Sequence, residues 1–486
     1  MVRTMTVICF CIMSGFFLCL GGCSLAPKYL RPAAPVSAQW PKGEAYKARW
    51  SGVQPSISWQ EFFINPKLRK VVAMALENNR DLRVAALNIE KAIALYQIQR
   101  SELFPGIDAS GSWSKEHQLI SGLPGGAQSP TIKRYSVELG ISAWELDIFG
   151  RIRSLKEQAL EQFSATEQAQ RGVQISLVAE VANTWLALAA DQEQLKLAQD
   201  TLKNRQDAYQ LVRRRFELGV SSELDLRQAQ MQVEAAKVDV ARYTTLVAQD
   251  ENALNLAVGK SVPPELLPHD LSETLAAVKE VAPGLPSDVL LRRPDILQAE
   301  DILKGANANI GAARADFFPR ITLTTNIGLM SEELSRLFKS GSDTWGFVPQ
   351  VILPIFDAGA SSANLRAAKV DRDIALARYE KAIQTAFREV ADALAQRGTI
   401  DEQAAAQRSL TDAAAATYHL SMSCYEKGID SYLNVLDAQR SLYAAQQGLI
   451  AIRLARLTNL VTLYKVLGGG GPQNSTSSNV SHPDKQ

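Results

Sequence analysis

Apolar residues recur every seven positions in two stretches of the first half of the chain, and these stretches meet at Gly219. A strict seven-residue repeat predicts helices packed side by side in a left-handed supercoil. The first stretch contains Val181, Leu188, Leu195, Leu202, Tyr209 and Phe216. The second contains Leu226, Val233, Val240, Val247 and Leu254. The second half of the chain echoes the pattern at Val435, Leu442, Leu449 and Leu463, with Arg456 as an interruption.

Proline and glycine are placed as long helices require. No proline occurs within 131–262 or within 355–471, and proline breaks helices. The first long helix is therefore expected to extend over about 65 residues, or roughly 100 Å at 1.5 Å per residue. We expect Gly219 to end this helix in the left-handed conformation, and Ser221 or Ser222 to cap the next one.

Other segments alternate between apolar and polar residues, which is the period of a β-strand with one apolar face. The apolar positions of three such strands are Ile107, Ala109, Gly111 and Trp113; Tyr135, Val137, Leu139, Ile141 and Ala143; and Ile321, Leu323, Thr325, Ile327 and Leu329. A fourth, less regular strand is expected at Trp345–Leu353, with turn-rich loops at His117–Pro130 and Ser331–Asp343. Strands of about ten residues can cross a membrane when they are tilted.

Four strands are too few to close a barrel, since the smallest membrane barrels contain about eight. Two chains would supply eight strands, and three would supply twelve. The alternative is a soluble pair of hairpins covered by the helices, but helices of roughly 100 Å extend far beyond so small a sheet. The pattern therefore favours an α+β membrane protein whose barrel is completed by several chains.

The chain also contains an internal repeat with a period of about 214 residues. Four pairs of matching segments occur in the same order: 79–82 with 293–296, 104–107 with 318–321, 146–149 with 353–356, and 216–220 with 425–429. Each half is expected to contain a helix, a β-hairpin and a long helical hairpin. The expected segments are a signal peptide (1–22), a lipid anchor with an N-terminal segment (23–66), the first repeat (67–257), a linker (258–289), the second repeat (290–466) and a C-terminal tail (467–486).

The first residues have the composition of an export signal. Arg3 is the only charge before an apolar run at 7–20, which is shorter than the about 20 residues of a transmembrane helix. Leu20-Gly21-Gly22-Cys23 resembles the lipobox of bacterial lipoproteins, in which the cysteine carries lipid. The alternative is a buried cysteine beside an ordinary cleavage site. Serine at position 24 favours export to the outer membrane, and Cys424 would be the one free thiol of the mature chain.

Composition mainly excludes function classes. The charges of the 52 basic and 51 acidic residues nearly cancel. Binding of nucleic acid would call for a basic patch, and this balance does not indicate one. The four histidines lack metal-site spacing, no G-x-S-x-G motif is present, and the glycines at 468–471 lack the Lys-Ser/Thr of a phosphate loop. We expect no enzyme, no metal and no cofactor apart from covalent lipid on Cys23. No apolar stretch of transmembrane length is expected after the signal peptide, so any spanning part is expected to be made of strands.

Four motifs resemble hallmarks of the TolC-like outer-membrane factors. They are Leu290-Leu291-Arg292-Arg293-Pro294-Asp295-Ile296 with Ala299-Glu300, 306–313 with Phe318-Pro319, 432–440, and 463–470. The resemblance extends from the lipobox to the C-terminal glycines. The chain is most similar to the lipoprotein branch that serves resistance-nodulation-division efflux systems, which includes OprM-like, CusC-like and NodT-type channels.

This resemblance implies a homotrimer lipid-anchored in the cell outer membrane and extending into the periplasm. Twelve strands would form the barrel, twelve long helices would continue it as a tunnel, and a mixed equatorial belt would surround the helices. The chain would be the exit duct of a tripartite efflux pump, passively conducting drugs, toxic compounds or metal ions. Its partners would be a periplasmic adaptor (membrane fusion) protein and an inner-membrane resistance-nodulation-division pump.

The resemblance also implies a gate just after the second helical turn. Leu433 would help form an apolar constriction, and Asp437 would form a ring of three carboxylates near the axis. Arg440 lies on the same helix face and would hold the ring shut through hydrogen bonds to a neighbouring helix. The alternative is an ordinary solvated Asp–Arg pair. The first repeat has Gln228 and Met231 at these positions, so a charged ring would come from the second hairpin only.

The two helical turns are the expected contact with the adaptor. The candidate residues are Gly219, Val220, Ser221, Gly428, Ile429 and Asp430. The alternative is ordinary turn chemistry without a partner. Cys424 departs from the arginine that the family usually has before this tyrosine, which places a salt bridge at this tip in doubt.

Two other functions remain open from the sequence. The exit duct of a type I protein secretion system uses the same architecture, although the lipobox and the Leu-Arg-Arg-Pro-Asp motif favour efflux. A non-conducting lipoprotein scaffold built of coiled coils would also have long helices, but the alternating strands argue against it. The transported substrate cannot be predicted from the sequence, because selection in such systems occurs mostly in the pump.

Overall fold

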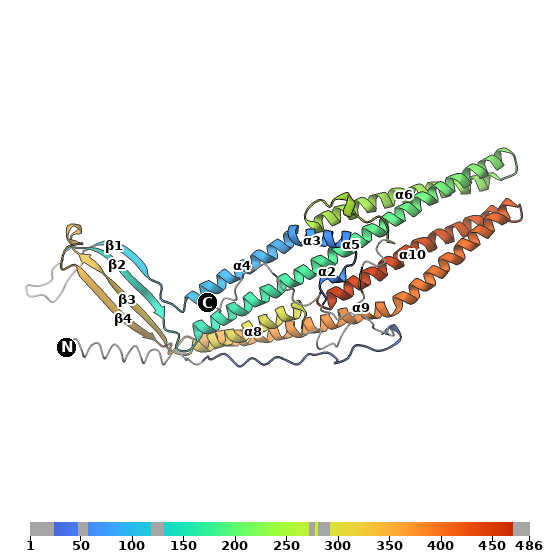
Figure 1. Ribbon diagram of the computed structural model, residues 1–486. Coiled ribbons are helices and arrows are strands. Elements are labelled where there is room, and N and C mark those ends of the chain that lie inside the picture. Colours follow the sequence, from blue (N-terminus) through green and yellow to red (C-terminus); the bar gives the residue numbers. More distant parts are fainter. Residues whose placement is uncertain (1–23, 47–56, 118–130, 272–277, 280–291, 470–486) are drawn as a thin grey trace, which may run out of the picture. The chain divides into compact units, whose positions relative to one another are not determined.

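The computed structural model describes residues 24–46, 57–117, 131–271, 278–279 and 292–469. The chain forms two compact units, each assembled from three segments. The sheet unit contains Met1–Ala33, Asn88–Glu167 and Gln298–Tyr379, and the hairpin unit contains Ala34–Leu87, Gln168–Leu297 and Glu380–Gln486. The four strands belong to the sheet unit, and the two turns that join the long helices belong to the hairpin unit (Figure 1).

The described residues are mostly helical. The α-helices are α2 (Trp59–Phe62), α3 (Pro66–Asn78), α4 (Arg80–Ser101), α5 (Arg151–Glu217), α6 (Glu223–Val258), α8 (Pro294–Ala315), α9 (Ala360–Glu426) and α10 (Tyr432–Val466). Short 3-10 helices are η2 (Glu44–Tyr46), η3 (Pro264–Leu266) and η5 (Leu334–Arg336). Helices α5 and α9 each contain 67 residues, close to the length predicted for the first of them. The two long helical hairpins predicted by the seven-residue repeat are α5–α6 and α9–α10.

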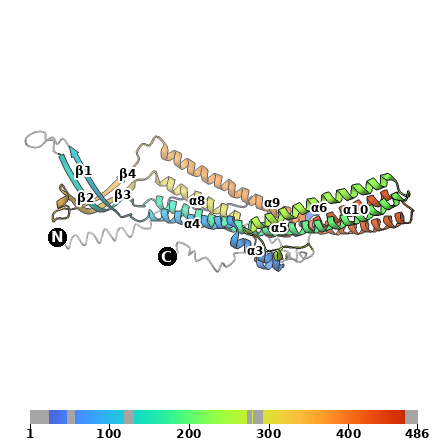
Figure 2. The same ribbon diagram turned by 90° about the horizontal axis from the view of Figure 1, so that it is seen from above.

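Four antiparallel strands form one sheet in the order β1-β2-β3-β4 (Figure 2). Their bounds are β1 (Asp108–His117), β2 (Thr131–Glu145), β3 (Arg320–Ser331) and β4 (Asp343–Ile352). The fourth strand lies within two residues of its predicted bounds, and η5 lies in the predicted loop before it. The other predicted loop falls on 118–130, which lie outside the described residues. Within the described chain, β1 and β4 each pair on one side only, so the sheet has two open edges.

The register places most of the apolar residues on one face of the sheet. Leu139 is opposite Ile327, and Ile327 is opposite Trp345, whose side chain is 78% exposed. On the other face, the Asn326 amide donates a hydrogen bond of 2.5 Å to the carboxylate of Glu138. The sheet therefore has one polar face and one apolar face that this chain leaves largely uncovered.

One detail of the strand prediction is wrong. The alternation predicts Ala143 on the apolar face of β2, but a β-bulge shifts the register between Ile141 and Trp144. Ala143 has φ of 51°, and Trp144 takes the position opposite Leu323. A bulge inserts one extra residue, so every later side chain moves to the other face.

An aspartate carboxylate caps the start of each of the two longest helices. The Asp147 carboxylate accepts hydrogen bonds from the backbone amides of Ile152 and Arg153, at 3.0 and 2.9 Å, at the start of α5. The Asp357 carboxylate accepts a 2.8 Å bond from the Ser361 amide at the start of α9. A carboxylate at a helix N-terminus satisfies amides that have no partner within the helix. Both long helices thus begin beside an aspartate, although the aligned segments 146–149 and 353–356 place Asp147 opposite Pro354 rather than Asp357.

The apolar core of the hairpin unit lies where α5 and α10 meet the short helices α2 and α3. Trp185 of α5 is fully buried, and its indole nitrogen donates a 3.0 Å hydrogen bond to the carbonyl of Leu266. The rings of Phe62 and Tyr464 stack with their centroids 4.2 Å apart. This core explains why the apolar stripe of α5 is buried at Val181 and becomes exposed further along the helix.

Arg293, from the motif before α8, is buried and closes the end of α10. Its Nη1 atom donates a 2.9 Å hydrogen bond to the carbonyl of Val466, the last residue of that helix. Its Nη2 atom lies 2.7 Å from an Asp295 oxygen and 2.8 Å from a Glu389 oxygen. Two carboxylates thus balance the buried charge, while the guanidinium satisfies a carbonyl that the helix cannot.

One expectation about membrane segments is wrong. The sequence predicts no apolar stretch of transmembrane length after the signal peptide, but α5 contains an 18-residue stretch that is apolar enough by composition. In the folded chain, 56% of that stretch is buried. Val181 and Leu188 are fully buried in the core of the hairpin unit. A helix packed on several sides needs apolar residues on several sides, which accounts for the composition.

Substituting Gly259 with alanine is expected to destabilise the hairpin unit by more than about 1 kcal/mol. Gly259 ends α6 with φ of 80°, and an added Cβ would collide with the backbone carbonyl of Asn78. Thermal unfolding followed by circular dichroism measures the effect. The control is Gly172→Ala within α5, where an added Cβ meets open space and a gain of about 0.5–1 kcal/mol is expected. Equal unfolding temperatures for the two variants would contradict this account.

Candidate functional site

The two helical hairpins turn through the same backbone motif, which Figure 1 shows at the ends of α5–α6 and α9–α10. Gly219 has φ of 72° and Gly428 has φ of 71°. The Val220 amide donates to the carbonyl of Arg215, and the Ile429 amide donates to that of Cys424, both at 2.9 Å. This is the Schellman arrangement, in which a left-handed glycine satisfies the last carbonyls of a helix. The predicted left-handed cap at Gly219 is confirmed.

The helices after the turns begin differently. Ser222 caps α6 by accepting a hydrogen bond from the Asp225 amide, and the Asp225 carboxylate accepts one from the Ser222 amide. The predicted serine cap is thus confirmed at Ser222. In the second hairpin, the exposed Asp430 carboxylate accepts 2.7 Å bonds from the Asn434 amide group and the Ser431 backbone amide. These bonds lower the pKa of Asp430 below its usual range and keep it ionised at neutral pH.

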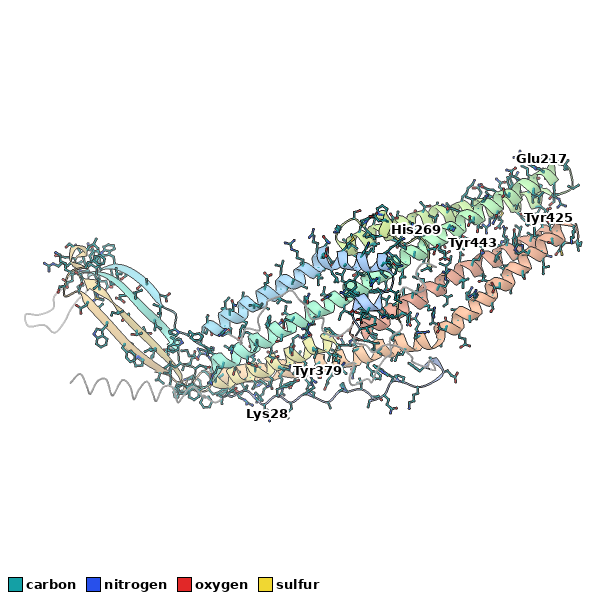
Figure 3. The ribbon with its side chains drawn as sticks, in the orientation of Figure 1. Lys28, Glu217, His269, Tyr379, Tyr425 and Tyr443 are labelled. Carbon is teal, nitrogen blue, oxygen red and sulfur yellow. The ribbon has the colours of Figure 1, made fainter. Side chains whose placement is uncertain are left out.

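A small apolar cluster joins all four helices just behind the turns. Its buried members are Val212 of α5, Ala229 of α6, Tyr425 of α9, and Tyr432, Val435 and Leu436 of α10. The rings of Tyr425 and Tyr432 lie 5.2 Å apart, and burial raises the pKa of Tyr432 to about 12. Tyr425, labelled in Figure 3, lies beside the second turn. The two hairpins of one chain are therefore held together close to their ends.

Arg215 is a residue at this tip that the sequence analysis missed. Its guanidinium carbon lies 4.7 Å from the centre of the Tyr425 ring, within the range of a cation–π contact. At the internal offset that aligns Gly219 with Gly428, Arg215 corresponds to Cys424, whose thiol is free. The cation beside this tyrosine thus comes from the first hairpin. The run of three arginines at 213–215 was the signal in the sequence.

The three residues of the expected gate lie on the exposed side of α10. Leu433 is 51% exposed, whereas Val435 and Leu436 face the cluster behind the turns. Arg440 Nη1 lies 3.5 Å from Asp437 Oδ1, and the two side chains are 52% and 71% exposed. Within one chain this is a weak surface pair, worth at most about 0.5 kcal/mol. The ion pair of Arg440 is therefore formed within its own helix.

The Asp437 carboxylate borders an open groove between α9 and α10. The groove has a volume of about 520 Å³. It is lined by Leu410, Ala413, Ala414, Thr417, Ser421, Asp430, Asn434, Asp437, Ala438 and Ser441. Most of these side chains are small or polar, so the groove can accept another helix closely.

The expected adaptor contacts are exposed at the turns. Val220 and Ile429 are large apolar side chains in solvent at equivalent positions of the two hairpins. Leu218 and Leu224 beside the first turn are exposed as well. Exposed large apolar side chains gathered on one surface are a feature of protein–protein interaction sites.

A second set of polar contacts joins the hairpins further from the turns. The Tyr443 hydroxyl of α10 donates a 3.2 Å hydrogen bond to the Asp239 carboxylate of α6. Tyr443 is labelled in Figure 3. The Gln447 amide donates a 3.1 Å bond to the hydroxyl of Tyr243. Arg205 is buried, and its guanidinium carbon lies 5.3 Å from the Tyr443 ring. Burial lowers the pKa of Arg205 below its usual value.

Cys23, the expected lipidation site, lies outside the described residues. Among the residues that the structure describes, no three His, Cys, Asp or Glu side chains are grouped so as to hold a metal ion.

Comparison with known proteins gives a consistent result. The family model described as outer membrane efflux protein matches residues 71–260 and 285–469. The chain is 50% identical over 463 residues to the probable efflux pump outer membrane protein TtgC of Pseudomonas putida, covering 95% of each protein. It is 41% identical over 453 residues to outer membrane protein OprJ of Pseudomonas aeruginosa, covering 93% of this chain and 94% of OprJ.

A solved structure agrees in fold. The open state of the MtrE outer membrane channel of Neisseria gonorrhoeae matches with a TM-score of 0.82 and 36% sequence identity. The match covers 94% of this chain and 100% of the MtrE chain.

Removing the Tyr443 hydroxyl is expected to loosen the contact between the hairpins. Tyr443→Phe should cost about 0.5–1.5 kcal/mol, the usual worth of one hydrogen bond, because Asp239 loses a donor. Denaturant unfolding followed by circular dichroism measures the loss. Tyr209→Phe is the matched control, since it removes a hydroxyl that has no hydrogen bond in the described structure. A cost as large for Tyr209→Phe would show that the effect does not come from the Tyr443–Asp239 contact.

Proposed function

This chain belongs to the outer membrane efflux protein family, and we propose that Leu433, Asp437 and Arg440 of α10 form the gate of its channel. The protein is the outer-membrane exit duct of a tripartite efflux pump. It acts as a homotrimer with a periplasmic adaptor protein and an inner-membrane pump. The family consists of channels rather than enzymes, and no catalytic step is part of the proposal.

The four-stranded sheet with two open edges is the observation that best supports the channel function. A backbone amide or carbonyl left unpaired inside a bilayer costs several kcal/mol, so the edges β1 and β4 need partners. Pairing β1 of one chain with β4 of the next satisfies both edges. Three chains then contribute twelve strands, and the largely apolar face of each sheet meets lipid while the polar face lines the pore.

The gate is supported by the position of three side chains on the exposed side of α10. Threefold symmetry brings three copies of Asp437 around one axis, where like charges repel and draw cations as the pore narrows. Arg440 is close enough to its own Asp437 to balance that charge, and it has donors left for a neighbouring chain. Leu433, one turn away, adds an apolar constriction that a hydrated ion crosses only when the helices separate.

Three further assignments belong to this proposal. Cys23 carries the lipid anchor, and the turns at Gly219 and Gly428 contact the adaptor through Val220 and Ile429. The segments 67–257 and 290–466 act as equivalent halves, in keeping with the two ranges that the family model matches. The segments 23–66, 258–289 and 467–486 contribute to a belt around the helices and to the tail.

We also propose that the cargo consists of toxic organic compounds. Relatives that are 50% identical to this chain are named as outer membrane proteins of toluene and antibiotic efflux pumps. Those names favour efflux over the secretion duct and the non-conducting scaffold.

Replacing Asp437 and Arg440 together with alanine is expected to raise the conductance of the purified trimer in planar lipid bilayers. The double substitution removes both the charged ring and the side chains that brace it, so the constriction widens. Single-channel current at fixed voltage gives the measurement.

Glu234→Ala with Lys237→Ala is the matched control, because it removes an exposed pair with the same spacing from α6. Conductance should stay at the wild-type value in this control. If the Asp437/Arg440 variant also conducts like the wild type, these residues are not the gate.

Deleting the gene for this chain in the bacterium that produces it is expected to increase the accumulation of a toxic dye. The pump then has no exit through the outer membrane. Cell-associated fluorescence before and after re-expression of the chain provides the measurement. A chain carrying Val220→Asp and Ile429→Asp should fold and reach the membrane but restore efflux poorly, since charge at the turns opposes adaptor contact. Dye accumulation that is the same with and without the chain would contradict the efflux function.

A further inference from the structure

Two lysines lie directly opposite each other in the first β-hairpin. The register of β1 and β2 pairs Lys115 with Lys133, and both side chains are exposed. The Cβ atoms of such a pair lie about 4.5–5.5 Å apart, and like charges at directly opposite positions destabilise a sheet. The next charged residues along the two strands, Glu116 and Arg134, lie on the other face. Within the described part of the chain, no acidic side chain forms an ion pair with either lysine.

The lysine pair lies on the apolar face of the sheet. Side chains alternate between the two faces of a strand, so Lys115 shares its face with Trp113. Lys133 shares its face with Tyr135 and Leu139, and Leu139 belongs to the apolar face described above. The two lysines therefore lie on the side of the sheet that meets lipid. This placement rests on the proposed orientation of the sheet in the membrane.

An aromatic pair marks the depth of the lysines in the membrane. Trp113 and Tyr135 are directly opposite, and the centroids of their rings lie 6.4 Å apart. Such side chains gather at membrane–water interfaces, level with the lipid headgroups. Strand β1 begins after α4 at Asp108 and leads away from it to His117 (Figure 1). Because the helices extend into the periplasm, the lysines lie on the outer side of the aromatic pair, about 7 Å beyond it.

We propose that Lys115 and Lys133 bind the phosphate group of a lipid in the outer leaflet of the outer membrane. A phosphate accepts hydrogen bonds from both ammonium groups and neutralises their charges, which removes the repulsion across the hairpin. The flexible lysine stems cover apolar surface while the charged ends reach the headgroup. The rings of Trp113 and Tyr135 lie below, beside the upper part of the acyl chains. The trimer contains three such sites, one on each chain.

Protection of a strand edge does not account for the pair. Lysine on an edge strand discourages unwanted pairing with other chains, and β1 is an edge of the sheet within one chain. Lys115 alone would serve that purpose. A second lysine directly opposite it on β2 adds repulsion, which a bound anion offsets.

Titration of the purified trimer in detergent with lipid A, a lipid that carries two phosphate groups, tests the site. Native mass spectrometry counts the lipid molecules bound to each trimer and gives the dissociation constant. Lys115→Gln with Lys133→Gln is expected to weaken binding by about tenfold or more, because each lysine near a charged membrane surface contributes about fivefold. Lys115→Arg with Lys133→Arg should bind at least as tightly as the wild type, since arginine also binds phosphate.

Lys369→Gln with Lys381→Gln is the matched control, because it removes two exposed lysines from α9. This variant should bind lipid A like the wild type. The temperature at which the lipid-free trimer dissociates should be no lower for the Lys115/Lys133 glutamine variant than for the control. That comparison separates loss of the site from damage to the fold.

Equal affinity of the wild type and the Lys115/Lys133 glutamine variant for lipid A would overturn the site. Equal binding of lipid A with and without its phosphate groups would overturn it as well. Displacement of lipid A by millimolar inorganic phosphate would indicate a site for free phosphate and would contradict the lipid assignment.

Fluorescence quenching by lipids with brominated acyl chains distinguishes failure of the site from failure of the proposed orientation. The difference between the wild type and Trp113→Phe in vesicles gives the signal of Trp113. Absence of quenching of that signal would show that the apolar face does not meet lipid, and the proposed orientation would fail. Quenching of Trp113 together with unchanged lipid A affinity of the glutamine variant would refute the phosphate site alone.

Discussion

The two open edges of the four-stranded sheet are the constraint on which the rest of the protein depends. Inside a bilayer no water is available to pair an edge, so the sheet is stable there only when it closes with copies of itself. One chain has β1 and β4 as unpaired edges, and neither repeat alone has more than one β-hairpin. Trimer formation is therefore a condition of membrane insertion. A threefold axis follows from it, and that axis turns single side chains such as Asp437 into rings.

The two repeats share a backbone plan but have diverged at the tip. Both hairpins end in the same Schellman turn. Asp437 of α10, however, has the uncharged Gln228 as its counterpart in the first repeat. The basic residue beside Tyr425 comes from α5 only, because Cys424 replaces it in the second repeat. Within one chain, the hydrogen bond from the Tyr443 hydroxyl to the Asp239 carboxylate still joins α10 to α6.

The helix that leads into β3 also binds residues near the start of the described chain. The buried Glu300 carboxylate of α8 accepts hydrogen bonds from Tyr29 and Arg31. Since Glu300 belongs to the motif region that begins at Leu290, this motif carries two structural roles. Arg293 caps α10 in the hairpin unit, and Glu300 binds Tyr29 and Arg31 in the sheet unit.

The sequence by itself determined the long helices, the four strands and the need for several chains, because periodicity, proline placement and strand count are local properties. It also located the turn at Gly219, since only a left-handed cap explains a glycine there. Tertiary structure alone decided the bulge at Ala143, the apolar burial of α5 and the pairing of Arg215 with Tyr425. It alone also brought Arg31 to Glu300. Each of these depends on residues far apart in the chain meeting in space, and no periodic pattern in one segment records which distant side chain it will contact.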